Sequence, residues 1–411
     1  MFRLIVALKR LAQELWVRVA LFAVLAVGSV LVAHLAAPLV PRSIAARIGP
    51  EAVTPILSIL AASMLTVSTF SLATMVSAHF AAAGTATPRV MRLLNADPTT
   101  HTVLSVFIGA FVYALTALIL FYAGFTGGAA LVLGVTLLVT LAVVVALVGW
   151  IAHLTNLGTL GDVLARTETT AKAALAQHRA QPALGARVLT ADTIIPSDAQ
   201  TLNAPQSGVL QVIDVAGLAQ CGAGAVWVLR RPGQVVLQGV PLARFSGAAE
   251  ASDLASDLAS DLASCFVIGD SRTFEQDPAY GLIVLSEIAS RALSPAVNDP
   301  GTAIEVISRL ERLLWDWANL EDADAAPITT VFVPGLTAPE VMDAAFESIG
   351  RDGAGLFEVC SHLLDALSSL SQSPDPDLAE AARGVARRAR ARAEMALSLE
   401  EDRLRLPALP K

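Results

Sequence analysis

The sequence predicts a membrane protein in which a four-helix transmembrane domain is followed by a cytoplasmic α+β domain. Three observations lead to this fold class. Hydrophobic residues make up 55% of the 411 residues and charged residues only 16%, with a mean hydropathy of +0.62. The apolar excess lies in residues 1–158, which contain four uncharged windows long enough to cross a bilayer. The remaining residues combine β-branched runs, Gly/Pro turns and amphipathic helices.

The four predicted spans are the windows at about 19–40, 52–83, 103–125 and 129–151. Residues 1–15 ahead of them form an amphipathic lead-in that we expect at the inner membrane interface. The first window is longer than the apolar part of a signal peptide, so we expect it to be kept as an anchor. Glycines in the third and fourth windows allow close helix packing, either within one subunit or between subunits.

The window at 52–83 has no Asp, Glu, Lys or Arg but contains nine Ser and Thr residues. As a helix it would be about 48 Å long, whereas the hydrocarbon core is about 30 Å thick. We therefore do not expect it to face lipid on all sides. One neutral face is predicted to line a pore; its members are Ser63, Thr66, Phe70, Thr74 and Ser77. The alternative is that these hydroxyls join neighbouring helices by hydrogen bonds.

Orientation follows from the Lys and Arg residues in the short flanks of the spans. Six of them lie in residues 1–18 and 84–102, against two in the connection between the first and second windows. This bias predicts that the N-terminus and, after four spans, the C-terminal domain are both cytoplasmic. The three cysteines, an odd number, all lie in that domain and fit a reducing compartment.

The soluble part is acidic. Residues 159–411 contain 20 Lys and Arg against 33 Asp and Glu, a net charge of −13, whereas residues 1–158 carry +5. An acidic domain argues against nucleic-acid binding. Lysine occurs only three times, which excludes a Gly-Lys-Ser/Thr phosphate loop and an interior Schiff-base lysine. We therefore predict no cofactor and no nucleic-acid partner.

Three histidines lie at the predicted cytoplasmic boundary of the spans: His79, His101 and His153. Histidine is a common metal ligand, but neither an HxxxH nor an HxxE spacing connects these three. Histidines that simply lie at the interface are the simpler interpretation. We therefore predict no metal site.

The soluble domain is predicted to have three parts. Residues 159–203 are a connecting helix and linker. Residues 204–246 contain β-branched runs between Gly and Pro-Gly turns, which predict a small β-barrel or sandwich. Their RPGQVVLQGVPL segment resembles the half-repeat of lipoyl-like barrel-sandwich domains but has no hairpin lysine, which leaves an adaptor or oligomer-forming module. Residues 247–411 are predicted to be mainly helical.

The mainly helical part begins with a repeat, SDLASDLASDLAS, at 252–264. Leu and Asp recur every four residues, which predicts a helix with one packed edge and one acidic, solvated edge. A basic face near the C-terminus could pair with that acidic edge, although solvation of both faces is the simpler expectation. Further helices are predicted at 278–293, 300–320, 337–350, 356–370 and 375–399, with a short strand at 329–333.

The densest polar stretch is 269–303, GDSRTFEQDPAYGLIVLSEIASRALSPAVNDPGTA, in which two polar turns flank one predicted helix. Acidic residues beside Arg and Asn suit a metal or phosphate ligand. No nucleophile, histidine or Gly-rich cradle accompanies them, so a polar corner between helices is favoured, with Asp299 as a helix N-cap. The candidates for this network or ligand site are Arg272, Glu275, Asp277, Arg291, Ser294, Asn298, Asp299 and Thr302.

The same stretch resembles a family of uncharacterised bacterial membrane proteins, a domain of unknown function. The segments GDSRTFEQDP and RALSPAVNDPGTA, together with barrel-like segments at 207–214 and 231–242, are similar to segments that this family shares. The resemblance covers nearly the whole chain. It implies a four-span protein of the bacterial inner (plasma) membrane and supplies no activity. Ser271 and Tyr280 stand where the family pattern often has Glu and Phe.

Two functions remain open from the sequence, neither of them enzymatic. The first is an oligomeric channel or pore lined by the second span, whose acidic soluble domain would favour inorganic cations. Four spans per chain would then require several subunits, so we expect a homo-oligomer in the lipid bilayer. The alternative is a membrane-anchored scaffold or sensor with a cytoplasmic partner-binding domain. A tethered enzyme acting at 269–303 ranks below both because it lacks a nucleophile and a histidine.

Overall fold

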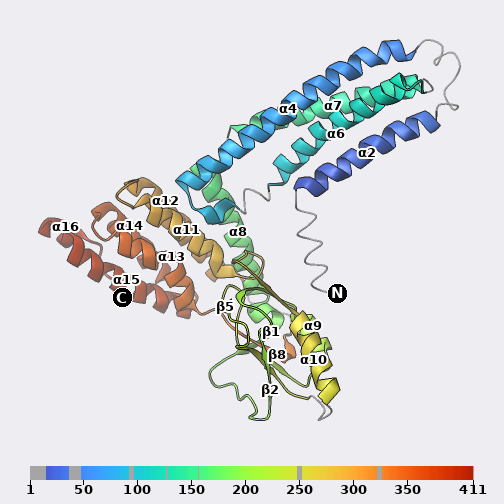
Figure 1. The fold of residues 1–411 in the computed structure, drawn as a ribbon. Helices are drawn as coiled ribbons and strands as arrows, with labels where there is room; N and C mark the ends of the chain where they lie inside the picture. The colour runs from blue at the N-terminus through green and yellow to red at the C-terminus, as the bar shows by residue number, and fades with distance from the viewer. Residues whose placement is uncertain are drawn as a thin grey trace. The chain divides into compact units, whose positions relative to one another are not determined.

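The computed structural model describes residues 15–36, 48–91, 97–125, 128–155, 157–247, 252–321 and 326–410. Two compact units divide the chain, one within Val6–Val163 and one within Leu164–Lys411 (Figure 1). The division falls five residues after the predicted boundary at 158. The predicted lead-in before residue 15 and the end of the 19–40 window lie outside the described residues. We refer to the two parts as the helical unit and the soluble unit.

The helical unit contains the four predicted spans. They are α2 (Leu15–Leu35), α4 (Pro50–Thr85), α6 (Pro98–Tyr122) and α7 (Ala129–Leu154), and each is long and apolar enough to cross a membrane. Proline at the first positions of α4 and α6 fits the start of a helix, where the missing N–H has no intrahelical partner. The prediction of four apolar helices is therefore confirmed within the described residues.

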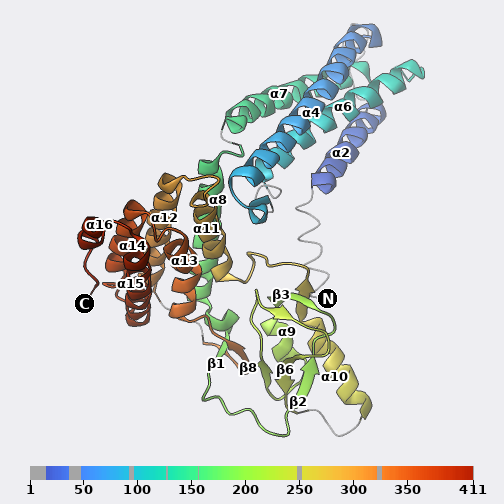
Figure 2. The ribbon, with the colours of Figure 1, turned by 60° about the vertical axis from the view of Figure 1, so that its left-hand side comes forward.

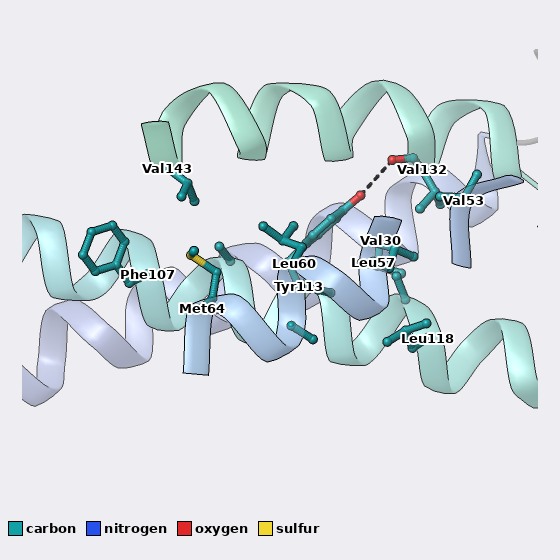
Figure 3. Close-up of a cluster of buried hydrophobic side chains, with 14 of the residues drawn as sticks. Val30, Val53, Leu57, Leu60, Met64, Phe107, Tyr113, Leu118, Val132 and Val143 are labelled. Atoms are coloured by element: carbon teal, nitrogen blue, oxygen red, sulfur yellow. Dashed lines mark hydrogen bonds between the residues drawn. The ribbon is translucent and has the colours of Figure 1, made fainter. Parts of the chain in front are cut away.

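Helix α6 is the packing centre of the helical unit. Of its apolar window 56% is buried, against 28% for α4 and 17% each for α2 and α7. Its Tyr113 is 1% exposed, and its hydroxyl donates to the carbonyl oxygen of Val132 in α7 at 2.9 Å, as Figure 3 shows. Leu57 of α4 and Phe107 of α6 are fully buried in the same cluster. The unit is thus built around its third span, although the second is the most unusual in sequence.

Helix α4 is longer than a bilayer needs. Its 36 residues correspond to about 54 Å of helix. One side, which includes Val53, Leu57 and Met64, packs against the other helices, while Ile59 and Phe80 on the other side are 68% and 74% exposed. Helix α4 therefore has one packed face and one open face in the isolated chain.

Two β-sheets organise the soluble unit. The five-stranded sheet has the order β1-β8-β4-β6-β2, and the three-stranded sheet has the order β5-β3-β7. Strands β1 and β4 both pair in parallel with β8, which lies between them. The strands are β1 (Ala186–Leu189), β2 (Gln200–Asn203), β3 (Gly208–Ile213), β4 (Val226–Val228), β5 (Val235–Val236), β6 (Pro241–Phe245), β7 (Phe266–Gly269) and β8 (Ile328–Pro334).

The β-structure extends beyond residues 204–246, where the sequence predicts a small barrel or sandwich, and includes the strand predicted at 329–333. Strands β1 and β2 come from the predicted linker, and β7 and β8 come from the predicted helical part. Strand β8 joins the sheet between β1 and β4 because its Val331 and Val333, at most 1% exposed, complete the core there. The strands of residues 204–246 are thus divided between a mixed five-stranded sheet and an antiparallel three-stranded sheet.

The tetrapeptide repeat forms α10 (Ser252–Ser264), as predicted. Leu262 is fully buried in the sheet core and Leu258 packs partly against it, whereas Asp257 and Asp261 are exposed. The side chains of residues 252–256 lie outside the described part of the repeat. A short helix, α9 (Val215–Gln220), begins at the N-cap Asp214. Figure 2 shows α9 and α10 beside the strands.

The other helices of the soluble unit pack against one another. Helix α13 contacts α11 and α15, and α14 contacts α12 and α15. The Arg-rich face of α15 pairs with α13 through Arg388 to Asp343 and Arg392 to Glu347, and not with the SDLA repeat in any contact found among the described residues. The helices are α8 (Leu160–Ala180), η3 (Pro182–Gly185), α11 (Pro278–Ala292), α12 (Pro300–Ala318), α13 (Ala338–Asp352), α14 (Phe357–Leu370), α15 (Pro376–Ala396) and α16 (Glu400–Arg405), beside η2 (Pro88–Val90) in the helical unit.

Candidate functional site

The first polar turn of the 269–303 stretch closes around a buried carboxylate at the start of α11. Asp277 is 3% exposed, and its Oδ2 lies 2.7 Å from both Nε and Nη2 of Arg272. Gly233 approaches the pair with φ +89°, and a Cβ built there would lie 2.1 Å from Asp277 Oδ2. Only glycine leaves room for this ion pair. We call the arrangement of Gly233, Arg272 and Asp277 the Asp277 corner.

Side-chain amides attach the same turn to the sheet. Gln276 accepts from the backbone N–H of Ile213 at 2.8 Å and donates to the carbonyl of Ile213 at 3.1 Å, as a neighbouring strand would. Gln211 donates to the carbonyl of Ser271 at 2.7 Å. The Arg272 guanidinium also lies 5.2 Å from the ring centre of Tyr280, which suits a cation–π contact. The turn is therefore fixed at several points.

A histidine that the sequence did not connect with this stretch lies beside it. His178 of α8, Gln276 and Asp277 line two small cavities of about 30 Å³ each, and each cavity has room for about one water molecule. The 269–303 stretch itself contains no histidine, and the fold brings His178 to the same cavities. Burial raises the pKa of Asp277, partly offset by Arg272, and burial together with Arg179 and Arg231 lowers the pKa of His178.

The second polar turn lies at the other end of α11, about 22 Å of helix away from the first. Asp299 caps α12, accepting from the backbone N–H of Thr302 at 3.1 Å and from its hydroxyl at 2.6 Å, and these bonds lower the pKa of Asp299. Asn298 takes the left-handed conformation at φ +50°, and its N–H donates to the carbonyl of Ser294 at 2.8 Å. The Ser294 hydroxyl donates to the carbonyl of Arg291 at 2.7 Å.

The eight candidates therefore divide into two turns rather than one constellation. Arg272, exposed Glu275 and Asp277 lie at the start of α11, and Glu275 lines one of the two small cavities. The other five hold the α11–α12 connection; they are Arg291, Ser294, Asn298, Asp299 and Thr302.

An arginine clamp joins the sheet to α13. The Arg231 guanidinium donates to the carbonyl of Gly335 at 2.9 Å and to both carboxylate oxygens of Glu340 at 2.8 and 2.5 Å. Glu340 also accepts from Thr337, forming the capping box that starts α13. Arg231 lowers the pKa of Glu340 to about 2, with further lowering by Thr337 and opposition from burial. The clamp fixes the loop between β8 and α13.

This clamp predicts an acid-dependent stability. The folded-state pKa of Glu340 lies below the value of about 4.3 for an unfolded chain. Its contribution is therefore fully present above about pH 5 and disappears as the pH falls toward 2. We expect Glu340→Gln to lower the thermal midpoint at pH 7 and to make progressively less difference between pH 5 and 2. A constant difference over this range would contradict the assignment.

A larger groove lies along the loop between β8 and α13, which the Arg231 clamp fixes. It has a volume of about 790 Å³ and is bordered by the end of β1, the β8–α13 loop and α15. Leu336 lines both this groove and one of the small cavities at the Asp277 corner. The lining residues are Val188, Leu189, Thr190, Ala191, Gly335, Leu336, Thr337, Ala338, Pro339, Asp343, Asp377, Glu380, Ala381, Gly384 and Arg388.

In the helical unit, the predicted pore-lining face of α4 points away from the other helices of the chain. Ser63, Thr66, Phe70 and Ser77 are exposed and Thr74 is half-buried. The Thr66 hydroxyl donates to the carbonyl of Ala62 at 3.0 Å, and the Thr74 hydroxyl bonds to Ser71 and Phe70 carbonyls at 2.9 and 3.2 Å. These threonine hydroxyls are thus satisfied within α4 itself.

Sequence reasoning missed several residues of the soluble site. His178, Gly233 and the groove residues carry no local signal, because they meet the polar stretch only through tertiary packing. The Thr337–Glu340 spacing is an exception, since Thr followed three residues later by Glu is a capping-box pattern.

The fold and these contacts together define a membrane protein with four apolar helices and a folded domain of mixed sheets and helices. Residues 12–369 match the family described as "Predicted membrane protein (DUF2254)", and the chain belongs to this family. This confirms the resemblance that the sequence suggested.

The relatives found are themselves uncharacterized. Uncharacterized proteins of Mycobacterium bovis and Mycobacterium tuberculosis are 32% identical over 191 residues, which is 43% of this chain and 36% of each relative. The match thus spans about a third of the length of these relatives. No solved structure matches the chain.

Proposed function

We propose that the chain is a non-enzymatic, membrane-anchored binding protein whose soluble groove holds an extended, cationic polypeptide segment. The observation that carries this proposal is the groove itself. Its volume of about 790 Å³ lies in the range of specific binding sites. The four apolar helices serve as the anchor.

The composition of the groove indicates the class of ligand. Strand β1 ends the five-stranded sheet, and its residues Val188 and Leu189 line the groove, so an added strand could pair along this edge. On α15 the small residues Ala381 and Gly384 leave room for side chains. Three carboxylates line the groove: Asp343, which pairs with Arg388; Glu380, which pairs with Arg383 and Arg387; and Asp377. Residues 159–411 carry a net −13. These charges favour a ligand with Lys or Arg.

Binding is measured with the full chain in lipid nanodiscs and a fluorescent decapeptide of alternating Val and Lys. We expect it to bind through alternate side chains, and a matched Val–Glu peptide to bind at least about tenfold more weakly, because of the acidic lining. Equal binding of the two peptides would contradict charge selection. If neither peptide binds, the groove does not recognise this class of ligand.

A substitution on α15 tests the location of the site. A Cβ at Gly384 would meet only Arg side-chain ends at 3.8 and 3.9 Å, so Gly384→Leu fits the helix and fills the groove. Replacing a helical glycine favours folding by up to about 1 kcal/mol. We therefore expect unchanged or raised thermal stability and at least about tenfold weaker peptide binding.

The matched control is Ala391→Leu, an exposed position on the same helix that does not line the groove. We expect it to bind the Val–Lys peptide like the wild type. Unchanged affinity in Gly384→Leu would mean that the peptide binds outside the groove. An equal loss of affinity in both variants would indicate a general effect on α15.

A second function rests on the open face of α4. Ser63, Thr66, Phe70 and Ser77 are available to another copy of the chain, so a homo-oligomer could enclose a cation pathway between its α4 helices. We rank it second because lipid can also cover a face whose threonine hydroxyls bond to their own helix. Potassium flux into proteoliposomes tests it. If the potassium flux is no greater than in protein-free liposomes, under voltage or a pH gradient, the chain does not form a channel.

We further propose that the helical unit lies in a bacterial inner membrane with the soluble unit in the cytoplasm. The support is the excess of Lys and Arg, six against two, in the flanks on that side. A cysteine introduced at exposed Ser398 should resist a membrane-impermeant maleimide in intact cells and react after lysis. Labelling in intact cells would mean that the soluble unit lies outside the cytoplasm.

A further inference from the structure

A cluster of titratable side chains lies at one end of the helical unit. Three of the chain's six histidines belong to it: His79 in α4, His101 in α6 and His153 in α7. They surround Asp97, which directly precedes α6, and His79 interacts electrostatically with both Asp97 and His101. Asp97, His79 and His101 are 3%, 8% and 5% exposed. Three helices therefore bring imidazoles to one buried carboxylate.

One carboxylate oxygen connects two of the helices. Asp97 Oδ2 accepts from the backbone N–H of Thr100 at 3.1 Å and from its hydroxyl at 2.5 Å, which caps α6. The same oxygen lies 2.7 Å from Nε2 of His153. The first turn of α6 is thus tied to the last turn of α7.

The chain leaves the helical unit beside this cluster. Gly158, four residues after α7, has φ +74°, and a Cβ built there would lie 2.6 Å from the carbonyl oxygen of Ala78. Ala78 directly precedes His79 in α4. The segment that leads into α8 therefore runs against α4 next to an imidazole of the cluster.

The balance of charge in the cluster depends on protonation. One Asp97 carboxylate can neutralise one imidazolium, whereas the cluster contains three imidazoles. Among the described residues of the helical unit, the other charged groups at this end are Arg18 in α2, Arg89 in η2 and Asp162 in α8. Imidazoles ordinarily titrate near pH 6.5. A second proton in the cluster would add a buried positive charge next to the imidazolium that Asp97 already neutralises, which is unfavourable.

We propose that His79, Asp97, His101 and His153 form a proton-binding site, and that its protonation loosens the contact of the end of α7 with α4 and α6. A proton suits the geometry better than a metal, because no three ligating side chains among the described residues are arranged to hold an ion.

The test uses the full chain in lipid nanodiscs and hydrogen exchange of the amides in residues 150–163. Exchange is expressed as a protection factor, which corrects for the intrinsic effect of pH. We expect the wild type to lose about tenfold protection between about pH 7.5 and 5.5. The double variant His79→Gln/His101→Gln should lose less than about threefold, because it cannot bind the extra protons.

His34→Gln is the matched control, since His34 lies at the other end of the bundle, in ring contact with Phe125. It should respond to pH like the wild type. Equal wild-type protection at the two pH values, or an equal fall in the double variant, would overturn the proposal. Carbon-13 NMR of labelled histidines in the wild type tests it without substitution: the cluster must bind at least one further proton in this pH interval, and no change would also overturn it.

Discussion

Replacing Gly233 with alanine is expected to destabilise the soluble unit by about 3–5 kcal/mol. The new Cβ would lie 2.1 Å from Asp277 Oδ2 and 2.7 Å from its Cγ, so the carboxylate or the turn has to move. Movement separates Asp277 from Arg272 and leaves a carboxylate buried without its ion-pair partner. About 1–2 kcal/mol of this loss comes from the left-handed φ of +89°, which any residue with a Cβ pays.

Gly239→Ala separates these two contributions. Gly239 has φ +80° and no atom within 4 Å of a Cβ, so its substitution carries the backbone cost alone. Urea unfolding of the full chain in detergent, followed by tryptophan fluorescence, should give Gly233→Ala a clearly larger loss than Gly239→Ala. Equal losses would mean that the Asp277 corner can rearrange freely.

The second large effect is expected at the crossing of α8 and α11. Gly281→Leu should destabilise the soluble unit by about 3 kcal/mol or more, because even a Cβ there would lie 2.5 Å from Ala171 Cβ and 2.9 Å from its Cα. Two ion pairs also join α8 to α12: Glu168 pairs with Arg309, and Lys172 pairs with Asp316 at 2.7 Å.

Gly384→Leu provides the comparison for this prediction. Both substitutions place leucine at a helical glycine, but only Gly281 faces the backbone of another helix. The same urea experiment should show a lowered midpoint for Gly281→Leu and an unchanged or raised midpoint for Gly384→Leu. A neutral result at Gly281 would indicate that α8 packs loosely on α11.

Local signals explain how much of the fold could be predicted. The helix of 300–320 was predicted from Asp299, Pro300 and an apolar period, and α12 spans Pro300–Ala318 with Asp299 as its cap. A short strand is expected at 329–333, and β8 spans Ile328–Pro334. The partners of β8 could not be predicted in this way, because parallel pairing with β1 and β4 depends on tertiary packing.

The candidate site was harder to predict for the same reason. The polar residues around α11 are visible in sequence, but a helix of 15 residues separates its two turns in space. The groove combines three distant segments that are mostly small and apolar, such as Ala191 and Ala381. Such residues have no chemical signature. The three histidines at the end of the spans stand out in the sequence, whereas Asp97, which the fold places among them, does not.

The pairing of β1 with β8 also constrains how the chain folds during synthesis. About 140 residues separate the two strands, so β1 and β4 emerge from the ribosome long before the strand that lies between them. Until β8 arrives, both carry unpaired edges able to join a neighbouring chain. A nascent chain stopped before Ile328 would thus be exposed to aggregation. The apolar helices ahead of it would tether that intermediate to a membrane.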